Sequence, residues 1–178
     1  MYFDDCQTLS HIELTEGNKF DSLEVFSIAN SSIASIGTNN TQFDASVFNN
    51  IASLSKVSSY RSDGTVTTTP FNFQNTNIVK IVNLTWNGSG NSLFSNCTKL
   101  TSIGGTLNLT TNINSIFYRC FVLETLPTIN IANSVTSATY AFVMNNALGY
   151  NNISAIIKKC TNVTNFSNAC QCTKFADN

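Results

Sequence analysis

The sequence predicts a repeat solenoid with short parallel β-strands, on three observations. A unit of apolar residues spaced three apart recurs along the chain, a stretch of alternating apolar residues accompanies it, and the two together repeat at a nearly fixed interval. Self-similarity with a period in the twenties is typical of solenoids, because one such unit cannot bury its apolar side until neighbouring units stack on it. We therefore expect residues 1–178 to form a single stacked array of about six or seven such units.

The three-apart unit is clearest in SLFSNCTKLTSIGG, residues 92–105, and it recurs in FYRCFVLETL, 23 residues later (120 − 97 = 23). Earlier versions are FDDCQTLSHI and FNNIASLSKV. The spacing excludes a strand and favours a short 3₁₀ or α turn, or an irregular arc. The residues predicted to form the buried repeat core are Phe3, Cys6, Leu9, Ile12, Phe48, Ile51, Leu54, Phe94, Cys97, Leu100, Ile103, Phe117, Cys120, Leu123, Leu126, Ile129, Ile131 and Phe142.

The alternating stretches predict one short strand in each repeat of about 23 residues, paired in parallel at roughly 4.8 Å. KIVNLTW, TLNLTTNI and TINIANSV are the clearest examples. The segment YRSDGTVTTTP breaks this pattern and indicates a turn between strands, so an irregular or inserted region is expected near residues 58–72. The pair Gly104 and Gly105 is expected to form a turn. No amphipathic cap helix is evident at either end, so neighbouring segments or another chain are expected to cover the solenoid ends.

Composition argues against several classes of protein. Charged residues make up only 11% of the chain and the net charge is −1, so there is no basic patch for nucleic acid. No apolar run is long enough to cross a bilayer. The opening MYFDDCQTLS lacks the basic and apolar regions of a signal peptide. The richness in Asn, Ser and Thr suits an extracellular, cell-surface or virion location.

The cysteines and the single histidine do not form a recognisable metal or catalytic motif. Cys6, Cys97, Cys120 and Cys172 share one repeat position, which Ile51 also occupies, and this favours a packing role. A disulfide that joins Cys160 to Cys170 or Cys172 remains the alternative in an oxidising compartment. His11 has no evident acid–base partner in the sequence, so we expect no catalytic residues, no metal and no cofactor.

The polar residues between the buried strand positions are the candidate binding site. Glu13, Asn83, Thr85, Asn108 and Asn130 alternate with apolar residues and should therefore face solvent. Stacked across repeats, they would form a flat ladder with little charge that could hydrogen-bond a sugar or a protein. The alternative is that these side chains only satisfy one another along the ladder.

The segments SVTSATYAFVMNNALG and LFSNCTKLTSIGG resemble the BspA-type leucine-rich repeat. The resemblance covers most of the chain, with a weak middle, and fails at the family's proline. It implies a surface protein that acts in adhesion or recognition of a host protein or glycan, without catalysis. Members also occur in phages, so the alternative is a structural protein of a phage head or tail, whose open ends dock on neighbouring subunits.

Overall fold

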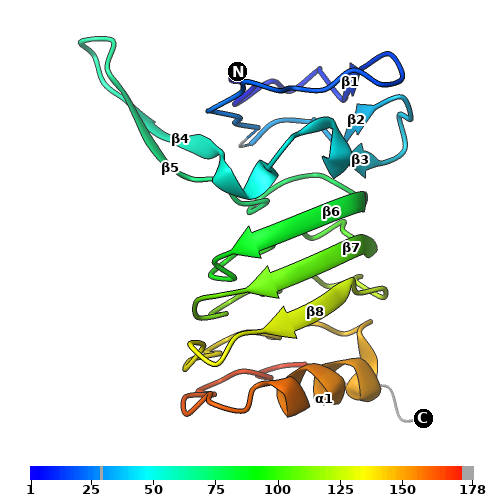
Figure 1. Ribbon diagram of the computed structural model, residues 1–178, viewed down its shortest axis with the longest axis vertical. Helices are drawn as coiled ribbons and strands as arrows, with labels where there is room; N and C mark the ends of the chain where they lie inside the picture. Colours follow the sequence, from blue (N-terminus) through cyan, green and yellow to red (C-terminus); the bar gives the residue numbers. More distant parts are fainter. Residues whose placement is uncertain (29, 174–178) are drawn as a thin grey trace.

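The structure is a computed structural model that describes residues 1–28 and 30–173. These residues form a solenoid whose main sheet has six parallel strands, in the order β1-β2-β3-β6-β7-β8 along the long axis (Figure 1). The predicted repeat solenoid with short parallel strands is confirmed. The strands are β1 (His11–Glu13), β2 (Ser35–Gly37), β3 (Phe43–Asp44), β6 (Lys80–Gly88), β7 (Ser102–Leu109) and β8 (Thr128–Ile131), and two 3₁₀ turns, η1 (Ala45–Val47) and η2 (Ile51–Ser53), follow β3.

The strands β6, β7 and β8 form the regular half of the sheet. Their apolar residues alternate with polar ones, so that Leu84 and Trp86 of β6 and Leu107 of β7 are buried inside the solenoid. In β6 one extra residue opposes β7, since Ile81 pairs with Ile103 but Leu84 pairs with Gly105. This β-bulge sets the register of every later pair. Gly104 and Gly105 both lie within β7, so the prediction of a turn at this pair was wrong.

One strand departs from the spacing of one per repeat. Ile36 of β2 pairs with Phe43 of β3, only seven residues further along the chain (43 − 36 = 7). Gly37, with φ of 111°, allows the chain to reverse directly after β2. The side chain of Asn39 then stabilises the short connection by accepting hydrogen bonds from the N–H and the hydroxyl of Thr41.

An antiparallel hairpin projects from the solenoid where the sequence pattern breaks (Figure 1). Its strands are β4 (Ser55–Tyr60) and β5 (Val66–Pro70). Asp63 accepts a 2.9 Å hydrogen bond from the N–H of Thr65, and Gly64 takes φ of 82°, as the tight turn requires. At its base, Lys56 donates to the side chain of Asn72 over 2.8 Å.

A helix, α1 (Gly149–Lys159), lies beside β8 where the next strand of the sheet would be (Figure 1). Ile153 and Ile156 are buried against the solenoid, whereas Tyr150 and Ile157 are exposed on the other side. The helix is therefore amphipathic and covers the edge of the sheet. The expectation that no amphipathic helix covers an end was wrong at this end.

The core is built around a column of phenylalanines. Phe73, Phe94, Phe117 and Phe142 come from successive turns and are fully buried. Their ring centroids are 5.3, 5.6 and 6.2 Å apart in that order, and each pair is stacked. Stacked rings at these distances stabilise each other beyond the burial of their surface. The column thus links each turn to the next.

Most predicted core residues of the regular half are buried, except Leu126 and Ile131, and those near the N-terminus are less buried. Leu9 is 37% exposed, so its placement in the core was wrong. It lies in the first turn of the solenoid, where only one described neighbouring turn packs on it. The half-buried members of the predicted set are Phe3, Cys6, Ile12, Leu126 and Ile131.

The repeat position that holds the cysteines is a buried hydrogen-bond donor. The thiol of Cys97 donates to the carbonyl oxygen of Phe73 over 2.9 Å, and that of Cys120 donates to the carbonyl oxygen of Phe94 over 3.1 Å. In later turns the amide of Asn145 donates to Phe117 and the hydroxyl of Thr173 to Phe142. We call these four residues, Cys97, Cys120, Asn145 and Thr173, the donor slot.

The donor slot corrects one sequence-based placement. Cys172, which was assigned to this position, is exposed, and Thr173 occupies the slot instead. In an earlier turn the buried residue three after Phe73 is Thr76, whose neighbour Asn75 is exposed. Burial raises the pKa of Cys97 to about 11, so its thiol stays protonated and able to donate at neutral pH.

Two substitutions of similar size at Cys120 distinguish the contribution of its hydrogen bond from that of its packing in the donor slot. We expect Cys120→Thr to retain the bond to Phe94, and Cys120→Val to lose it. Loss of one such hydrogen bond costs about 1 kcal/mol, so the valine variant should be less stable than the threonine variant by about that amount in urea unfolding. Equal stabilities, or a more stable valine variant, would mean that the position requires packing alone.

The compact arcs carry a repeated backbone strain. Each arc of the regular half places two residues four apart at positive φ, where side chains other than those of Gly and Asn are disfavoured. Tyr140 and Met144 have φ of 56° and 60°, and Arg119 has φ of 58°. The full set in the four arcs is Ser92, Asn96, Ser115, Arg119, Tyr140, Met144, Asn168 and Cys172.

Relief of this strain should stabilise the protein. Tyr140 is 41% exposed, so its ring contributes little to the core. We expect Tyr140→Asn to raise the free energy of unfolding by about 1 kcal/mol, because Asn tolerates the left-handed region. Thermal unfolding would measure the change. Tyr140→Phe keeps the Cβ and ring and should leave stability unchanged; an equal gain in both variants would contradict the explanation by strain.

Candidate binding face

The outer face of β6–β8 carries the same three-residue pattern on each strand. The pattern is Thr, a buried apolar residue, then Asn, and it occurs as TWN, TLN and TIN. The strand register places the threonines opposite one another, and likewise the asparagines. We call this set the T-x-N face. Its members are Thr85 and Asn87 of β6, Thr106 and Asn108 of β7, and Thr128 and Asn130 of β8.

The asparagines are linked into one chain of hydrogen bonds. The amide nitrogen of Asn108 donates to the amide oxygen of Asn87 over 2.6 Å, and that of Asn130 donates to the amide oxygen of Asn108 over 2.8 Å. Such a ladder holds each side chain in one orientation and favours a flat sheet. An amide has two N–H groups and two acceptor lone pairs, so each Asn keeps hydrogen-bonding capacity beyond the ladder.

The T-x-N face is a regular polar grid. In-register strands lie about 4.8 Å apart, and residues two apart on one strand lie about 6.6 Å apart. Thr85 and Asn87 are exposed, and Thr106 and Asn108 are half-buried because strands flank β7 on both sides. None of the six side chains is charged. The face can therefore offer closely spaced donors and acceptors to a flat ligand.

The structure brings three of the five predicted binding residues together and separates the other two. Thr85, Asn108 and Asn130 lie on the T-x-N face. Glu13 is on β1, which β2 and β3 separate from β6. Asn83 occupies the bulge of β6 with φ of 56°, and its amide donates to the carboxylate of Asp44 over 3.1 Å.

Asp44 explains why Asn83 belongs to the scaffold. The same carboxylate oxygen accepts a 2.7 Å hydrogen bond from the hydroxyl of Ser46 and a 3.0 Å bond from its N–H. Burial alone would raise the pKa of Asp44, but the bonds from Ser46 and Asn83 hold it below its ordinary value. The side chain of Asn83 is thus tied to an ionised carboxylate.

Sequence reasoning missed Asn87, Thr106 and Thr128. The signal was present, because the T-x-N pattern recurs at residues 85, 106 and 128, at intervals of 21 and 22 residues (106 − 85 and 128 − 106). A search that treated polar residues as a repeat of their own would have found it.

His11 has a partner that the sequence did not indicate. Its Nδ1 lies 2.9 Å from the hydroxyl oxygen of Ser35 on the neighbouring strand β2. That hydroxyl also donates to the carbonyl oxygen of Ser10 over 3.4 Å, and Ser35 is 1% exposed. A nucleophilic serine must be reachable by a substrate, and this hydroxyl is enclosed.

The cysteines are all free thiols in the structure, including Cys160, Cys170 and Cys172. Burial raises the pKa of Cys160 and of Cys170. A reactive cysteine needs a lowered pKa, so these environments disfavour the thiolate. Within residues 1–28 and 30–173, no three His, Cys, Asp or Glu residues gather as metal ligands would.

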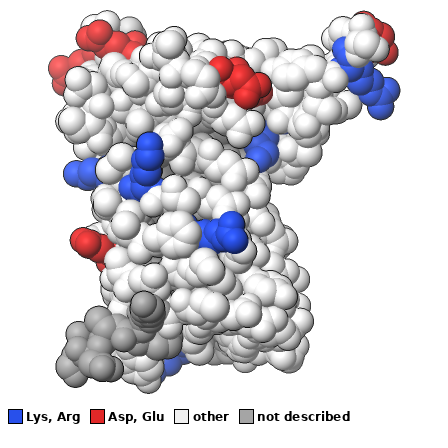
Figure 2. All heavy atoms as spheres, turned by 180° about the vertical axis from the view of Figure 1, so that it is seen from behind, with Lys and Arg blue, Asp and Glu red and all other residues white. Residues whose placement is uncertain are grey.

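Charge is sparse and unevenly distributed. In the view from behind, acidic side chains gather at the end of the solenoid that holds β1, and both signs occur at the tip of the hairpin (Figure 2). The tip carries Arg61 and Asp63. No helix in the described part of the chain combines the length and apolarity needed to cross a bilayer.

Comparisons with protein-family models, with curated proteins and with solved structures gave no match for this chain. The resemblance to the BspA-type repeat therefore stays a prediction that rests on the sequence pattern.

Proposed function

We propose that the protein is a non-catalytic recognition module that binds a glycan through the T-x-N face, as part of adhesion at a cell surface or virion. The observation that carries the proposal is the in-register alignment of three Thr-x-Asn triplets on exposed adjacent strands. The Asn ladder accounts for only part of the hydrogen-bonding capacity of these outward side chains, and the remaining donors and acceptors are presented at regular spacing. A ligand with a regular array of hydroxyl groups can pair with them.

The chemistry of the face favours a glycan over a protein. Sugar hydroxyls both donate and accept hydrogen bonds, and the amides of Asn87, Asn108 and Asn130 do the same. The six side chains offer no large exposed aromatic or Arg anchor of the kind that dominates protein interfaces. Trp86, between Thr85 and Asn87, is 3% exposed and faces the core.

Two observations support a non-catalytic role. The hydroxyl of Ser35, the partner of His11, is enclosed. Burial raises the pKa of the Cys97 and Cys120 thiols, which disfavours the thiolate that nucleophilic attack needs.

A glycan array with the purified protein tests the proposal. We expect selective binding to linear glycans, and loss of that binding in Thr106→Arg, which places a bulky charge at the centre of the face. Thr68→Arg is the matched control, because Thr68 is an exposed strand residue on the distant hairpin. Binding to no glycan, or equal binding by both variants, would refute a glycan role for the T-x-N face.

The projecting hairpin favours a second candidate, a structural subunit of a phage head or tail. An isolated two-stranded hairpin is marginally stable in water, and outside its base this one is held by a 3.3 Å hydrogen bond from Tyr60 to Asp4. An arm of this kind would be fixed by a neighbouring subunit. Deletion of residues 58–68 should then abolish assembly of the protein with its neighbouring subunits while the solenoid stays folded. Unchanged assembly of the deletion variant would refute this second candidate.

A further inference from the structure

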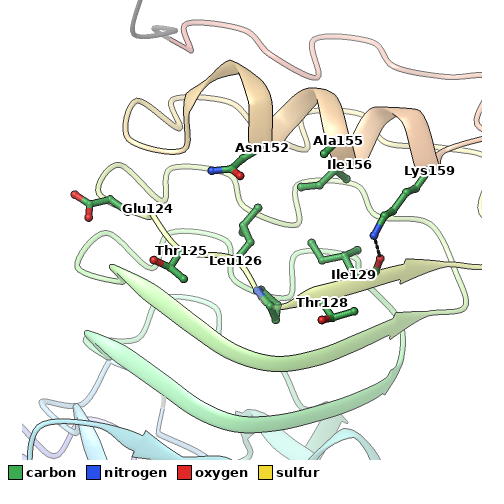
Figure 3. A pocket seen from close by; sticks show the side chains of 10 residues that line it. Glu124, Thr125, Leu126, Thr128, Ile129, Asn152, Ala155, Ile156 and Lys159 are labelled. Carbon is green, nitrogen blue, oxygen red and sulfur yellow. Dashed lines mark hydrogen bonds between the residues drawn. The ribbon is translucent and has the colours of Figure 1, made fainter. Parts of the chain in front are cut away.

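A groove of about 390 Å³ separates β8 from α1. Its lining mixes apolar and polar residues. Leu126, Pro127 and Ile129 on the strand side and Ala155 and Ile156 on the helix side are apolar, whereas Thr125, Thr128 and Asn152 are polar. Figure 3 shows side chains of both walls directed into the space between the two elements. Glu124 lies at one end of the groove, and Lys159 lies toward the other (Figure 3).

The groove runs along the outer edge of β8. Within the described residues β8 pairs with β7 on one side only, and the helix takes the place of the next strand. The ammonium group of Lys159 donates to the carbonyl oxygen of Ile129 over 2.7 Å (Figure 3). The carbonyl of Ile129 is therefore turned away from β7 and toward the groove.

The backbone of β8 is thus an edge that can accept a further strand. The N–H and C=O of one strand residue point to the same edge, and neighbouring residues point to opposite edges. Ile129 and Ile131 accordingly direct their backbone groups to the side of α1. Pro127 has no N–H to satisfy, as is usual on an edge strand. A helix cannot continue the backbone hydrogen bonds of the sheet. The ammonium group of Lys159 instead supplies the hydrogen bond that the carbonyl oxygen of Ile129 would receive from a neighbouring strand.

We propose that this groove binds an extended peptide segment as an added parallel strand on β8, with its C-terminal carboxylate at Lys159. The added strand would pair its backbone with the outward groups of Ile129 and place alternate side chains against the apolar residues of the groove, such as Leu126 and Ala155. It would displace the Lys159 ammonium from the carbonyl of Ile129 and leave it free to bind the carboxylate. In a parallel arrangement the N-terminal end of the peptide lies toward Glu124.

This site overlaps the T-x-N face at Thr128, which lines the groove, and is otherwise built from the edge of β8 and the inner side of α1. The variants at Lys159 and Ala155 lie outside the T-x-N face, and Thr106 lies outside the groove. Variants of one site can therefore be examined while the other stays intact, and either proposal can fail alone.

Peptide titration followed by ¹⁵N chemical shifts tests the inference. The probe is Ac-PTINIA with a free C-terminus, which copies residues 127–132, because a copy of β8 reproduces the strand pairing and side-chain alternation of the solenoid's own repeat. We expect saturable binding with shifts confined to β8 and α1. A C-terminal amide should weaken binding about tenfold, since it removes a charge-assisted hydrogen bond. Methylation of alternate backbone nitrogens of the peptide should abolish binding, because it removes the N–H groups that would pair with β8.

Matched variants assign the roles of the groove residues. Lys159→Met should weaken binding of the free acid about tenfold but not of the amide, whereas Lys158→Met, one residue away and exposed, should change neither. Ala155→Arg fills the groove and should prevent binding, and Asn151→Arg, exposed on the same helix, should not. No saturable binding, equal binding of the methylated peptide, or equal effects of the two lysine variants would each overturn the proposal.

Discussion

Replacement of Gly105 by alanine is expected to destabilise the protein by more than about 3 kcal/mol. Gly105 has φ of 122°, a conformation that residues with a Cβ rarely adopt. A Cβ there would lie 2.1 Å from the carbonyl oxygen of Leu84 and 2.7 Å from its nitrogen. These are backbone atoms of the neighbouring strand, so β6 and β7 would have to separate.

Gly104 provides the control in the same strand. A Cβ on Gly104 would lie 3.7 Å from the carbonyl oxygen of Ile81, which is an ordinary contact. Gly104→Ala should therefore leave the free energy of unfolding within about 1 kcal/mol of the parent. Urea unfolding, followed by the fluorescence of the single tryptophan, Trp86, measures both variants. Equal stability of the two would contradict the close approach of β6 and β7 at the bulge.

The bulge in β6, which lies opposite Gly105, also explains why the binding face could be predicted only in part. Alternation along the sequence placed Thr85, Asn108 and Asn130 on the outer side of their strands. Their alignment depends on the extra residue at Asn83, because the bulge brings Thr85 opposite Thr106. A bulge changes register without a clear mark in the sequence, so apolar alternation alone does not show which polar residues become neighbours. The recurrence of Thr-x-Asn was the sign that could have shown it.

The repeat core was predictable because its residues recur at fixed spacing. Phe94, Cys97, Leu100 and Ile103 are all buried in the structure. The donor slot was harder to place, since a search for apolar residues or cysteine selects Cys172. The slot needs a donor for a buried carbonyl, and Thr173 fills it, which hydrophobic periodicity cannot reveal.

The helix α1 was missed for a related reason. Ile153 and Ile156 continue the spacing of three that marks the arcs of the solenoid, and this spacing also fits a helix. A longer step of 28 residues separates the donor-slot residues Asn145 and Thr173 (173 − 145 = 28), against 23 between Cys97 and Cys120. That extra length was the available sign of an element wider than an arc.

Truncation of Phe117 is the second large effect that we expect. Phe117 is fully buried, and its ring lies 5.6 Å from that of Phe94 and 6.2 Å from that of Phe142. Phe117→Ala should cost about 3–5 kcal/mol, since it removes a buried ring and leaves a cavity that the stacked turns cannot close. Equilibrium urea unfolding gives the loss directly.

Phe121 tests whether the column, and not aromatic content, causes this loss. It lies four residues further along the chain and is 36% exposed, so Phe121→Ala should cost less than about 1 kcal/mol. Because turns of a solenoid contact only their neighbours, Phe117→Ala should also weaken the packing of Phe94, and the two truncations together should cost less than their sum. Equal losses at Phe117 and Phe121, or strict additivity of Phe94→Ala and Phe117→Ala, would show that the rings do not act as one column.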